Sequence, residues 1–147
     1  MEINMIVEIP KGSRVKYEVD KDTGVMRADR LVPMPYPESY GYIPNTLADD
    51  NDPLDIFLLS EHALAPGTIV KVQVLGMIEM MDNGEKDHKI LATWHDSAKL
   101  EHIDVIIKNV RNFLTVYKPN VELGFSSSFN DAMAYIKYCQ GRYEKKI

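Results

Sequence analysis

The sequence predicts a mainly β protein with flanking helices, an α+β fold in which a closed or partly closed antiparallel barrel precedes two C-terminal helices. Three observations support this fold class. Apolar and polar residues alternate with a period of two in the first part of the chain, turn residues separate the alternating stretches, and helical spacing begins near Leu100. With 147 residues, 45% of them hydrophobic, the chain is long enough for one domain over residues 1–147.

Three strands are expected in the N-terminal part, at residues 3–9, 14–20 and 25–31. The turn residues 21–24 join the second strand to the third. In the second strand Lys16 and Glu18 share a face, because side chains two residues apart on a strand point the same way. A proline-rich stretch at 32–37 then interrupts the strands, since proline cannot donate to a sheet.

Three more strands are expected in the central part, at residues 55–60, 68–81 and 89–94. The turn 65–67 contains Pro66 and Gly67 and precedes the long strand, which Gly76 is expected to bend. The sequence Asp82-Asn83-Gly84 predicts a hairpin turn before the last of these strands.

Two helices follow. The first is expected from Leu100 to Tyr117 and ends at Lys118, because Pro119 restricts the residue before it. Its apolar positions fall on one helical face and are Leu100, Ile103, Ile106, Ile107, Val110, Phe113, Leu114 and Tyr117. The second helix is expected at 129–143 with Ser128 as its N-cap, and its inner face is formed by Ala132, Met133, Ile136 and Cys139.

Charge and composition exclude some classes of protein. A net charge of −5 argues against a nucleic-acid partner, which requires a basic face. No apolar run approaches the roughly 18 to 20 residues that cross a bilayer, so no membrane partner is expected. The first residues carry Glu2 and Glu8 and resemble no leader peptide, and Cys139 is the single cysteine. These features predict a cytoplasmic protein.

The strongest chemical signal is an acidic cluster. Asp50, Asp52 and Asp55 fall within six residues, where a loop meets an apolar strand. Crowded carboxylates repel one another and favour a bound cation, and oxygen ligands select hard ions such as magnesium, manganese or calcium. A solvated acidic turn is the competing interpretation. An EF-hand loop is excluded, because Asp55 stands where that loop needs glycine at its sixth position.

Further charged residues are spaced so that acids and bases share strand faces. Asp82 and Asp87 flank the hairpin turn, and Lys89 lies on the same face as Asp87. Lys16 and Glu18 share a face in the second strand, and Arg30 follows in the third. Taken singly these are ordinary surface charges, but together they offer acids for metals and bases for phosphate oxygens.

With these motifs in place, the sequence resembles the soluble family I inorganic pyrophosphatases from Glu8 to about Lys118. The segment Asp50-Asn51-Asp52-Pro53-Leu54-Asp55-Ile56 matches the signature D-x-D-P-x-D followed by an aliphatic residue. The other matching blocks are Val7-Glu8-Ile9-Pro10, Lys16-Tyr17-Glu18, Asp29-Arg30, Tyr36-Pro37, Tyr40-Gly41-Tyr42, Asp82 with Asp87 and Lys89, and Tyr117-Lys118.

The resemblance implies a five-stranded OB-type barrel and a role for each matching residue. It implies that Mg²⁺, or Mn²⁺ or another divalent metal, is held by Asp50, Asp55 and Asp87, with Glu18 and Asp82 facing metals that arrive with pyrophosphate. Asp52 would accept the proton of a metal-activated water that attacks one phosphorus in line, without a covalent enzyme intermediate. The implied phosphate-binding residues are Lys16, Arg30, Tyr40, Lys89, Tyr117 and Lys118, and Glu8 and Tyr36 would support the site.

The resemblance also implies a homo-oligomer, a hexamer in bacterial relatives. The chain departs from the family at Asn83, where bacterial relatives carry glutamate, and at residues 119–124, where further lysines and a tryptophan are common. Tyr42 is assigned to core packing. Two alternatives remain: an OB-type module for single-stranded nucleic acid, which the net charge opposes, and a degenerate pyrophosphatase, which the intact aspartates oppose.

Overall fold

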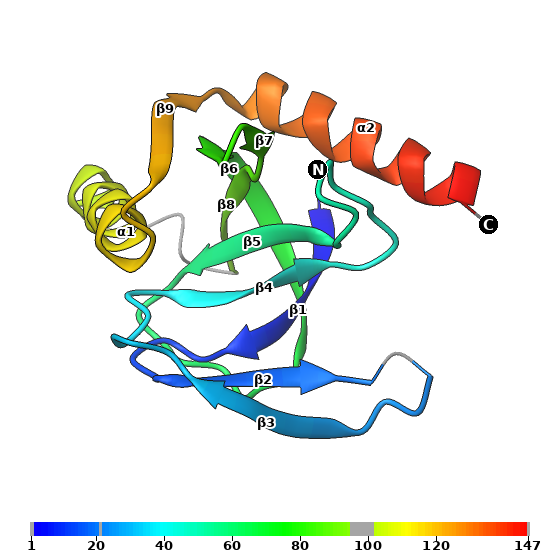
Figure 1. The fold of residues 1–147 in the computed structure, drawn as a ribbon, viewed down its shortest axis with the longest axis vertical. Helices are drawn as coiled ribbons and strands as arrows, with labels where there is room; N and C mark the ends of the chain where they lie inside the picture. The colour runs from blue at the N-terminus through cyan, green and yellow to red at the C-terminus, as the bar shows by residue number, and fades with distance from the viewer. Residues whose placement is uncertain (1, 21, 95–101, 147) are drawn as a thin grey trace.

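The computed structural model describes residues 2–20, 22–94 and 102–146. The elements follow the order expected for strands first and helices last (Figure 1). In chain order they are β1 (Glu2–Ile9), β2 (Val15–Val19), β3 (Met26–Leu31), β4 (Ser39–Ile43), β5 (Leu54–Leu59), β6 (Ile69–Asp82), β7 (Glu85–Lys86), β8 (Lys89–Thr93), α1 (Ile103–Tyr117), β9 (Val121–Ser127) and α2 (Phe129–Lys146).

Five strands pair in a closed ring in the order β1, β4, β5, β8, β6 and back to β1. The mainly β fold class and the five-stranded barrel are therefore confirmed. The expectation of a wholly antiparallel barrel is wrong at one pairing, because β5 and β8 are parallel. A closed ring with an odd number of strands cannot reverse direction at every step, so one parallel pair is unavoidable.

The strands β2 and β3 form a two-stranded sheet of their own outside the ring. Figure 1 shows this hairpin lying beside the barrel, with its tip away from α1. Lys16 and Arg30 are directly paired in its register. The sequence predicted both strands, but their separation from the barrel appears only in the structure.

The long strand β6 bends as predicted, with a register shift between Val74 and Gly76 where it pairs with β8. A second glycine sits where β1 and β4 come closest. Gly41 pairs with Val7, and a Cβ at position 41 would collide with the carbonyl oxygen of Ile6. Glycine is therefore required for this approach of the two strands.

Both faces of β5 are buried, and they face different parts of the core. Leu54, Ile56 and Leu58 belong to the cluster inside the barrel, which α2 extends through Ala132, Met133, Ile136 and Cys139. Phe57 and Leu59 belong to a second cluster, which contains Val110, Phe113 and Leu114 of α1. Because side chains alternate along a strand, Asp55 lies on the outer face of the barrel, the face that α1 covers.

Both predicted helices are present. Helix α1 ends at Tyr117, and Lys118 takes an extended conformation before Pro119, as expected. Leu100 lies outside the described residues. Ser128 caps α2 as predicted, because its Oγ accepts the Asp131 N–H at 3.3 Å. Neither helix within the described ranges is long and apolar enough to cross a membrane.

The two departures from the family pattern have structural explanations. Asn83 and Gly84 have positive φ values of 53° and 81°, which suits asparagine and glycine in the tight turn between β6 and β7. Residues 121–127, for which no strand was predicted, form β9 and pair with β6. Pairing of β9 starts opposite Asp82, so this segment covers the edge of the long strand close to the acidic residues.

Candidate active site

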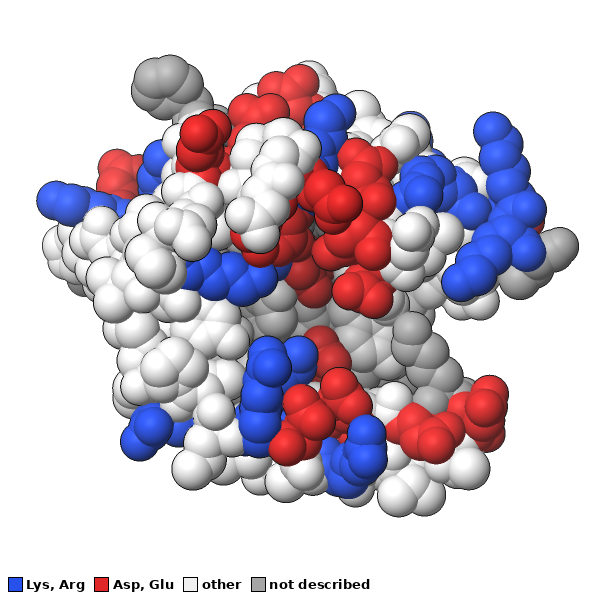
Figure 2. Space-filling view, in the orientation of Figure 1, with Lys and Arg blue, Asp and Glu red and all other residues white. Residues whose placement is uncertain are grey.

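An acidic cavity opens between the barrel wall and the β2–β3 hairpin. Figure 2 shows acidic side chains around a hollow on this face, with basic side chains at its edge. The cavity has a volume of about 510 Å³ and is lined by Glu8, Lys16, Glu18, Val19, Asp20, Tyr42, Asp52, Pro53 and Asp55. Five of the residues predicted from the sequence thus meet here, from β1, β2, β5 and the loop before β5.

A smaller cavity has a volume of about 90 Å³. Lys16 lines both cavities, so the two lie next to each other. Its lining is basic and aromatic and comprises Lys16, Arg30, Tyr36, Tyr40, Met80, Lys89, Leu114, Tyr117 and Lys118. All the residues predicted to bind phosphate therefore gather in one place. Ammonium and guanidinium groups with a tyrosine hydroxyl suit a ligand rich in phosphate oxygens.

Three strands of the barrel place a row of functional side chains on its outer face. Tyr42 of β4 pairs with Asp55 of β5, and Asp55 pairs with Lys89 of β8. Directly opposite residues on neighbouring strands point to the same side. The barrel register therefore holds the tyrosine, the carboxylate and the ammonium side by side on rigid strands.

Lys89 is the centre of a buried ionic network. Its Nζ donates to Asp55 Oδ2 at 2.6 Å, to Asp87 Oδ1 at 2.9 Å and to the Tyr40 hydroxyl at 3.2 Å. The Lys89 side chain is only 4% exposed. Burial would lower the pKa of Lys89, but the two carboxylates outweigh burial and raise it, so the ammonium stays charged. Burial also raises the pKa of Asp55, which Lys89 opposes.

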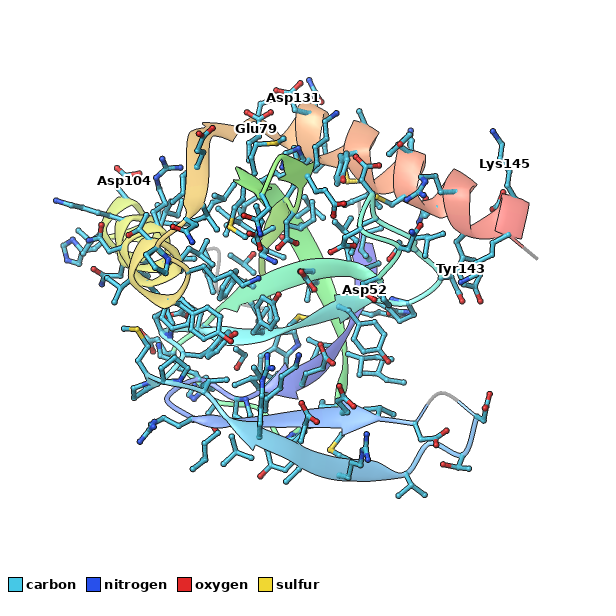
Figure 3. The ribbon with its side chains drawn as sticks, viewed as in Figure 1. Asp52, Glu79, Asp104, Asp131, Tyr143 and Lys145 are labelled. Carbon is cyan, nitrogen blue, oxygen red and sulfur yellow. The ribbon has the colours of Figure 1, made fainter. Side chains whose placement is uncertain are left out.

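The loop before β5 carries Asp50 and Asp52 on a tight turn. The Asp52 N–H donates to Asp50 Oδ1 at 3.0 Å, and Asn51 between them has a φ of 68°. Figure 3 shows Asp52 beside the ends of β4 and β5. Burial and the nearby charges of Asp87, Asp52 and Asp55 raise the pKa of Asp50.

This carboxylate set fits hard divalent cations in chemical terms. The donors are oxygen atoms alone, and the raised pKa of Asp50 means that the site disfavours its own negative charge. Among the described residues, no three acidic, histidine or cysteine side chains are close enough together to hold a metal ion in this conformation. The Lys89 ammonium instead supplies the counter-charge between Asp55 and Asp87.

Tyrosine and phenylalanine rings of the barrel and α1 pack behind the smaller cavity. The Tyr36 ring centroid lies 4.6 Å from Phe113, 5.2 Å from Tyr40 and 5.8 Å from Tyr117. Tyr36 is buried, and burial raises its pKa, so its hydroxyl remains neutral. Tyr36 thereby fixes Tyr40 and Tyr117, the two tyrosines that line the cavity with it.

The remaining predicted acids lie at the rim. Lys118 Nζ is 3.2 Å from Asp82 Oδ2 and 3.7 Å from Asp87 Oδ2, which joins both acids to the smaller cavity. Glu18 lines the larger cavity and accepts a hydrogen bond from Arg27 Nη2 at 3.2 Å. Every residue predicted for the site therefore lies in or beside the two cavities.

Some residues of the site were missed or misassigned. Tyr42 was assigned to core packing, but it lines the acidic cavity opposite Asp55. The alternation with Tyr40 across Gly41 was the available signal, since both tyrosines lie on one strand face. Asp20 was not predicted, and neither was Arg142 of α2, which contacts the Asp50 loop and which no local pattern identifies.

Comparison with known proteins identifies the family of this chain. The family model described as inorganic pyrophosphatase matches residues 5–144. Soluble inorganic pyrophosphatase 3 of Arabidopsis thaliana is 41% identical over 80% of this chain, which spans 58% of that protein. A soluble inorganic pyrophosphatase of Solanum tuberosum is 40% identical over 98% of this chain and 74% of its own length.

A solved structure shows the same fold over nearly the whole chain. The inorganic pyrophosphatase from Coxiella burnetii superposes with a TM-score of 0.87 and 31% identity, covering 97% of this chain and 95% of its own. The family-model match, the named relatives and the shared fold agree with one another. The chain belongs to the soluble family I inorganic pyrophosphatases, which are hydrolases.

Proposed function

We propose that this chain, as a single domain over residues 1–147, hydrolyses inorganic pyrophosphate to two orthophosphates where its two cavities meet. The observation that carries the proposal is the junction itself. A carboxylate-lined cavity and a lysine-, arginine- and tyrosine-lined cavity share Lys16. One end of such a site suits cations and the other suits phosphate oxygens, and pyrophosphate bound with its cations presents both.

The chain's carboxylates would hold the cations. Asp50, Asp55 and Asp87 would hold the activating metals, and Glu18 and Asp82 would face metals that accompany the substrate. Divalent cations, when bound, lower the pKa of a water molecule and neutralise charge on the phosphates. Mg²⁺ is the proposed metal, because small oxygen-rich sites facing phosphate are its usual setting. Mn²⁺ or another divalent metal is the alternative.

The chain's own groups perform the other tasks. Asp52 accepts the proton of the attacking water at a carboxylate oxygen, as a general base. Lys16, Arg30 and Lys118 donate to the phosphate oxygens and stabilise the charge on the departing phosphate. The attack is direct and in line. No covalent intermediate with the enzyme is proposed, and Glu8 and Tyr36 support the groups in contact with the ligands.

Lys89 has two partners in succession in this proposal. Before cations bind, it neutralises Asp55 and Asp87 at 2.6 and 2.9 Å. With cations held by the carboxylates, the Lys89 ammonium would be available to a phosphate oxygen, and Tyr40 would be the neighbouring donor. The register that pairs Lys89 with Asp55 supports this proposal, because it places the ammonium beside the carboxylate.

We also propose a cytoplasmic location and assembly into a homo-oligomer, a hexamer by resemblance to bacterial relatives. The relatives in Arabidopsis and Solanum are named soluble pyrophosphatases, which supports the location. Val105 and Val116 of α1 are exposed at 54% and 67%, and such apolar side chains on a helix are available for packing between subunits.

The purified protein is expected to release phosphate from pyrophosphate when magnesium is present and not when a chelator has removed divalent metals. Calcium should inhibit, because it favours larger and looser coordination than the octahedra of magnesium. A phosphate-release assay with magnesium, with chelator and with both metals measures this. An unchanged rate after chelation, or no release with magnesium and pyrophosphate together, would refute the proposed function.

Lys118→Ala is expected to raise KM for pyrophosphate and to leave the melting temperature nearly unchanged. Its ion pair with Asp82 is 41% exposed on the lysine side, and exposed pairs contribute about 0 to 1 kcal/mol. The competing role is a cation at the end of α1, worth about 0.3 to 1 kcal/mol of stability without any effect on turnover.

Lys108→Ala is the matched control, because Lys108 is exposed on the same helix and lines neither cavity. Steady-state kinetics and thermal unfolding of both variants separate the two roles. A normal KM and kcat for Lys118→Ala together with a lowered melting temperature would favour the helix-end role.

A further inference from the structure

Helix α2 holds the loop that carries Asp50 and Asp52 through Tyr138, Cys139 and Arg142, which line neither of the two cavities. The Tyr138 hydroxyl donates to Asp49 Oδ1 at 2.8 Å, and the Leu47 N–H donates to the Cys139 carbonyl at 3.0 Å. Arg142 makes most of the contacts between α2 and this loop. Its Nη1 donates to the carbonyl of Leu47 at 3.2 Å and to that of Ala48, and its Nη2 donates to Asn51 Oδ1 at 3.1 Å.

The acceptors of Arg142 are the fixed points of the acidic turn. The Ala48 carbonyl also accepts the Asn51 N–H at 2.9 Å, and the Ala48 N–H donates to the Asp52 carbonyl at 2.7 Å. Asn51 holds the left-handed conformation that reverses the chain, with a φ of 68°. Arg142 therefore hydrogen-bonds both to Ala48, where this turn starts, and to Asn51, where the chain reverses. Asp50 and Asp52 are the neighbours of Asn51 in the chain.

Asp55 reaches the cavity by a different route, since its backbone is held within the barrel between β4 and β8. The distance between Asp55 and the pair Asp50 and Asp52 is thus not set by the barrel alone. It also depends on how the loop is held against α2. Cation sites built from several segments are sensitive to such supporting contacts.

An arginine is suited to this position in a way that a lysine is not. The planar guanidinium has five N–H donors in a fixed fork and can bind several acceptors at once. Arg142 uses it for two backbone carbonyls and one amide oxygen. A lysine has the same charge but cannot span these acceptors with fixed geometry.

We propose that Arg142 is a positioning residue that sets Asp50 for cation binding and holds Asp52 beside it in the same turn, acting through Leu47, Ala48 and Asn51 without touching cation or substrate. The inference rests on the proposed function insofar as Asp50 serves a cation site. The competing explanation is that Arg142 only helps α2 to pack on the barrel and has no specific effect on the acidic turn.

The test is equilibrium magnesium titration of Arg142→Gln and Arg142→Lys by calorimetry. Loss of contacts that orient metal ligands typically lowers metal affinity about 10- to 100-fold, and we expect this for both variants. Lys145→Gln is the control, since Lys145 points into solvent at the end of α2 (Figure 3).

Amide hydrogen exchange of the metal-free protein separates positioning from general packing. The N–H groups of Asn51 and Asp52 are held within the turn and should exchange faster in both Arg142 variants. Protection of β5 should not change. Equal loss of protection in β5, or restoration of magnesium affinity by Arg142→Lys, would overturn the inference in favour of packing or charge.

Asn51→Gly provides a milder variant if the Arg142 variants fail to fold. Glycine accepts the positive φ at this position and removes only the amide acceptor of Arg142. Weaker magnesium binding is expected, and unchanged affinity would overturn the inference. None of these titrations contains pyrophosphate, so a chain that binds magnesium but releases no phosphate would refute the proposed function while the role of Arg142 is still decided.

Discussion

Asp52→Asn is expected to lower kcat by about 10²- to 10⁴-fold, the usual cost of losing a general base, while magnesium binds nearly as well as before. The amide keeps the shape of the side chain and removes its basicity. Asp52 and Asp55 both line the acidic cavity. The rate of the variant should rise more steeply with pH than that of the original, because hydroxide from solvent must replace the missing base.

Variants of the other two aspartates in the D-x-D-P-x-D signature distinguish a general base from a metal ligand. Asp55→Ala should weaken magnesium binding severely and recover only part of its activity at high magnesium, because Asp55 is proposed to serve two metals. The magnesium affinity of Asp50→Ala should fall between those of Asp52→Asn and Asp55→Ala. Magnesium titration beside kcat for each variant measures the difference, and Asp104→Asn on α1, away from Asp52 in Figure 3, is the control. If Asp52→Asn loses as much metal affinity as Asp55→Ala, Asp52 is a ligand and the assigned base is wrong.

Lys89→Met is expected to lower the free energy of unfolding of the metal-free protein by about 3 kcal/mol. Removing one partner of a buried ion pair costs about 3 to 5 kcal/mol, and the lower end applies because the Asp55 side chain keeps 22% exposure. Methionine fills similar space but leaves Asp55 and Asp87 without their counter-charge. Magnesium should restore part of the loss, since it binds the folded state and neutralises the same carboxylates.

The loss should also depend on pH. Burial alone would raise the pKa of Asp87, but Lys89 and then Lys118 lower it in the intact protein. A carboxyl group whose pKa is lower in the folded than in the unfolded protein stabilises the fold at pH values above its unfolded pKa. This stabilisation is lost as the pH falls through the folded pKa. Without Lys89 the buried carboxylates take up protons at higher pH, so the gap between variant and original should narrow as the pH falls from 7.5 to about 5.

Urea unfolding with chelator and with magnesium, at both pH values, measures these effects. Lys71→Met is the matched control, because Lys71 is exposed on β6, and such surface changes usually stay within about 0.5 kcal/mol. A loss as small as that of the control would show that Lys89 does not stabilise the carboxylates. A loss independent of both magnesium and pH would point to packing as its cause.

Local patterns in the sequence were sufficient for most elements and for the acidic signature. Runs of strand-forming residues between turn residues located β1, β5, β6 and β8, and Ser128 marked the start of α2, because these signals depend on neighbouring residues alone. The crowding of Asp50, Asp52 and Asp55 within one loop is likewise a local fact. The family signature then indicated which distant residues belong with them.

Only the tertiary structure decided how distant segments meet. The β2–β3 hairpin leaves the ring, β5 and β8 run parallel, and β9 covers the edge of β6. Each depends on pairing between strands far apart in the chain, for which alternation gives the faces of a strand but not its neighbour. Tyr42 was misassigned for this reason, since its place beside Asp55 is a matter of register.

Arg142 shows the same limit at a single residue. In the sequence it is one of several charged residues in the last turns of a helix, and nothing nearby distinguishes it. Docking of α2 against the loop brings its guanidinium to Leu47, Ala48 and Asn51. The sequence by itself determined which side chains can bind cations and phosphates, whereas strand register and helix docking decided their arrangement, because that depends on contacts between distant segments.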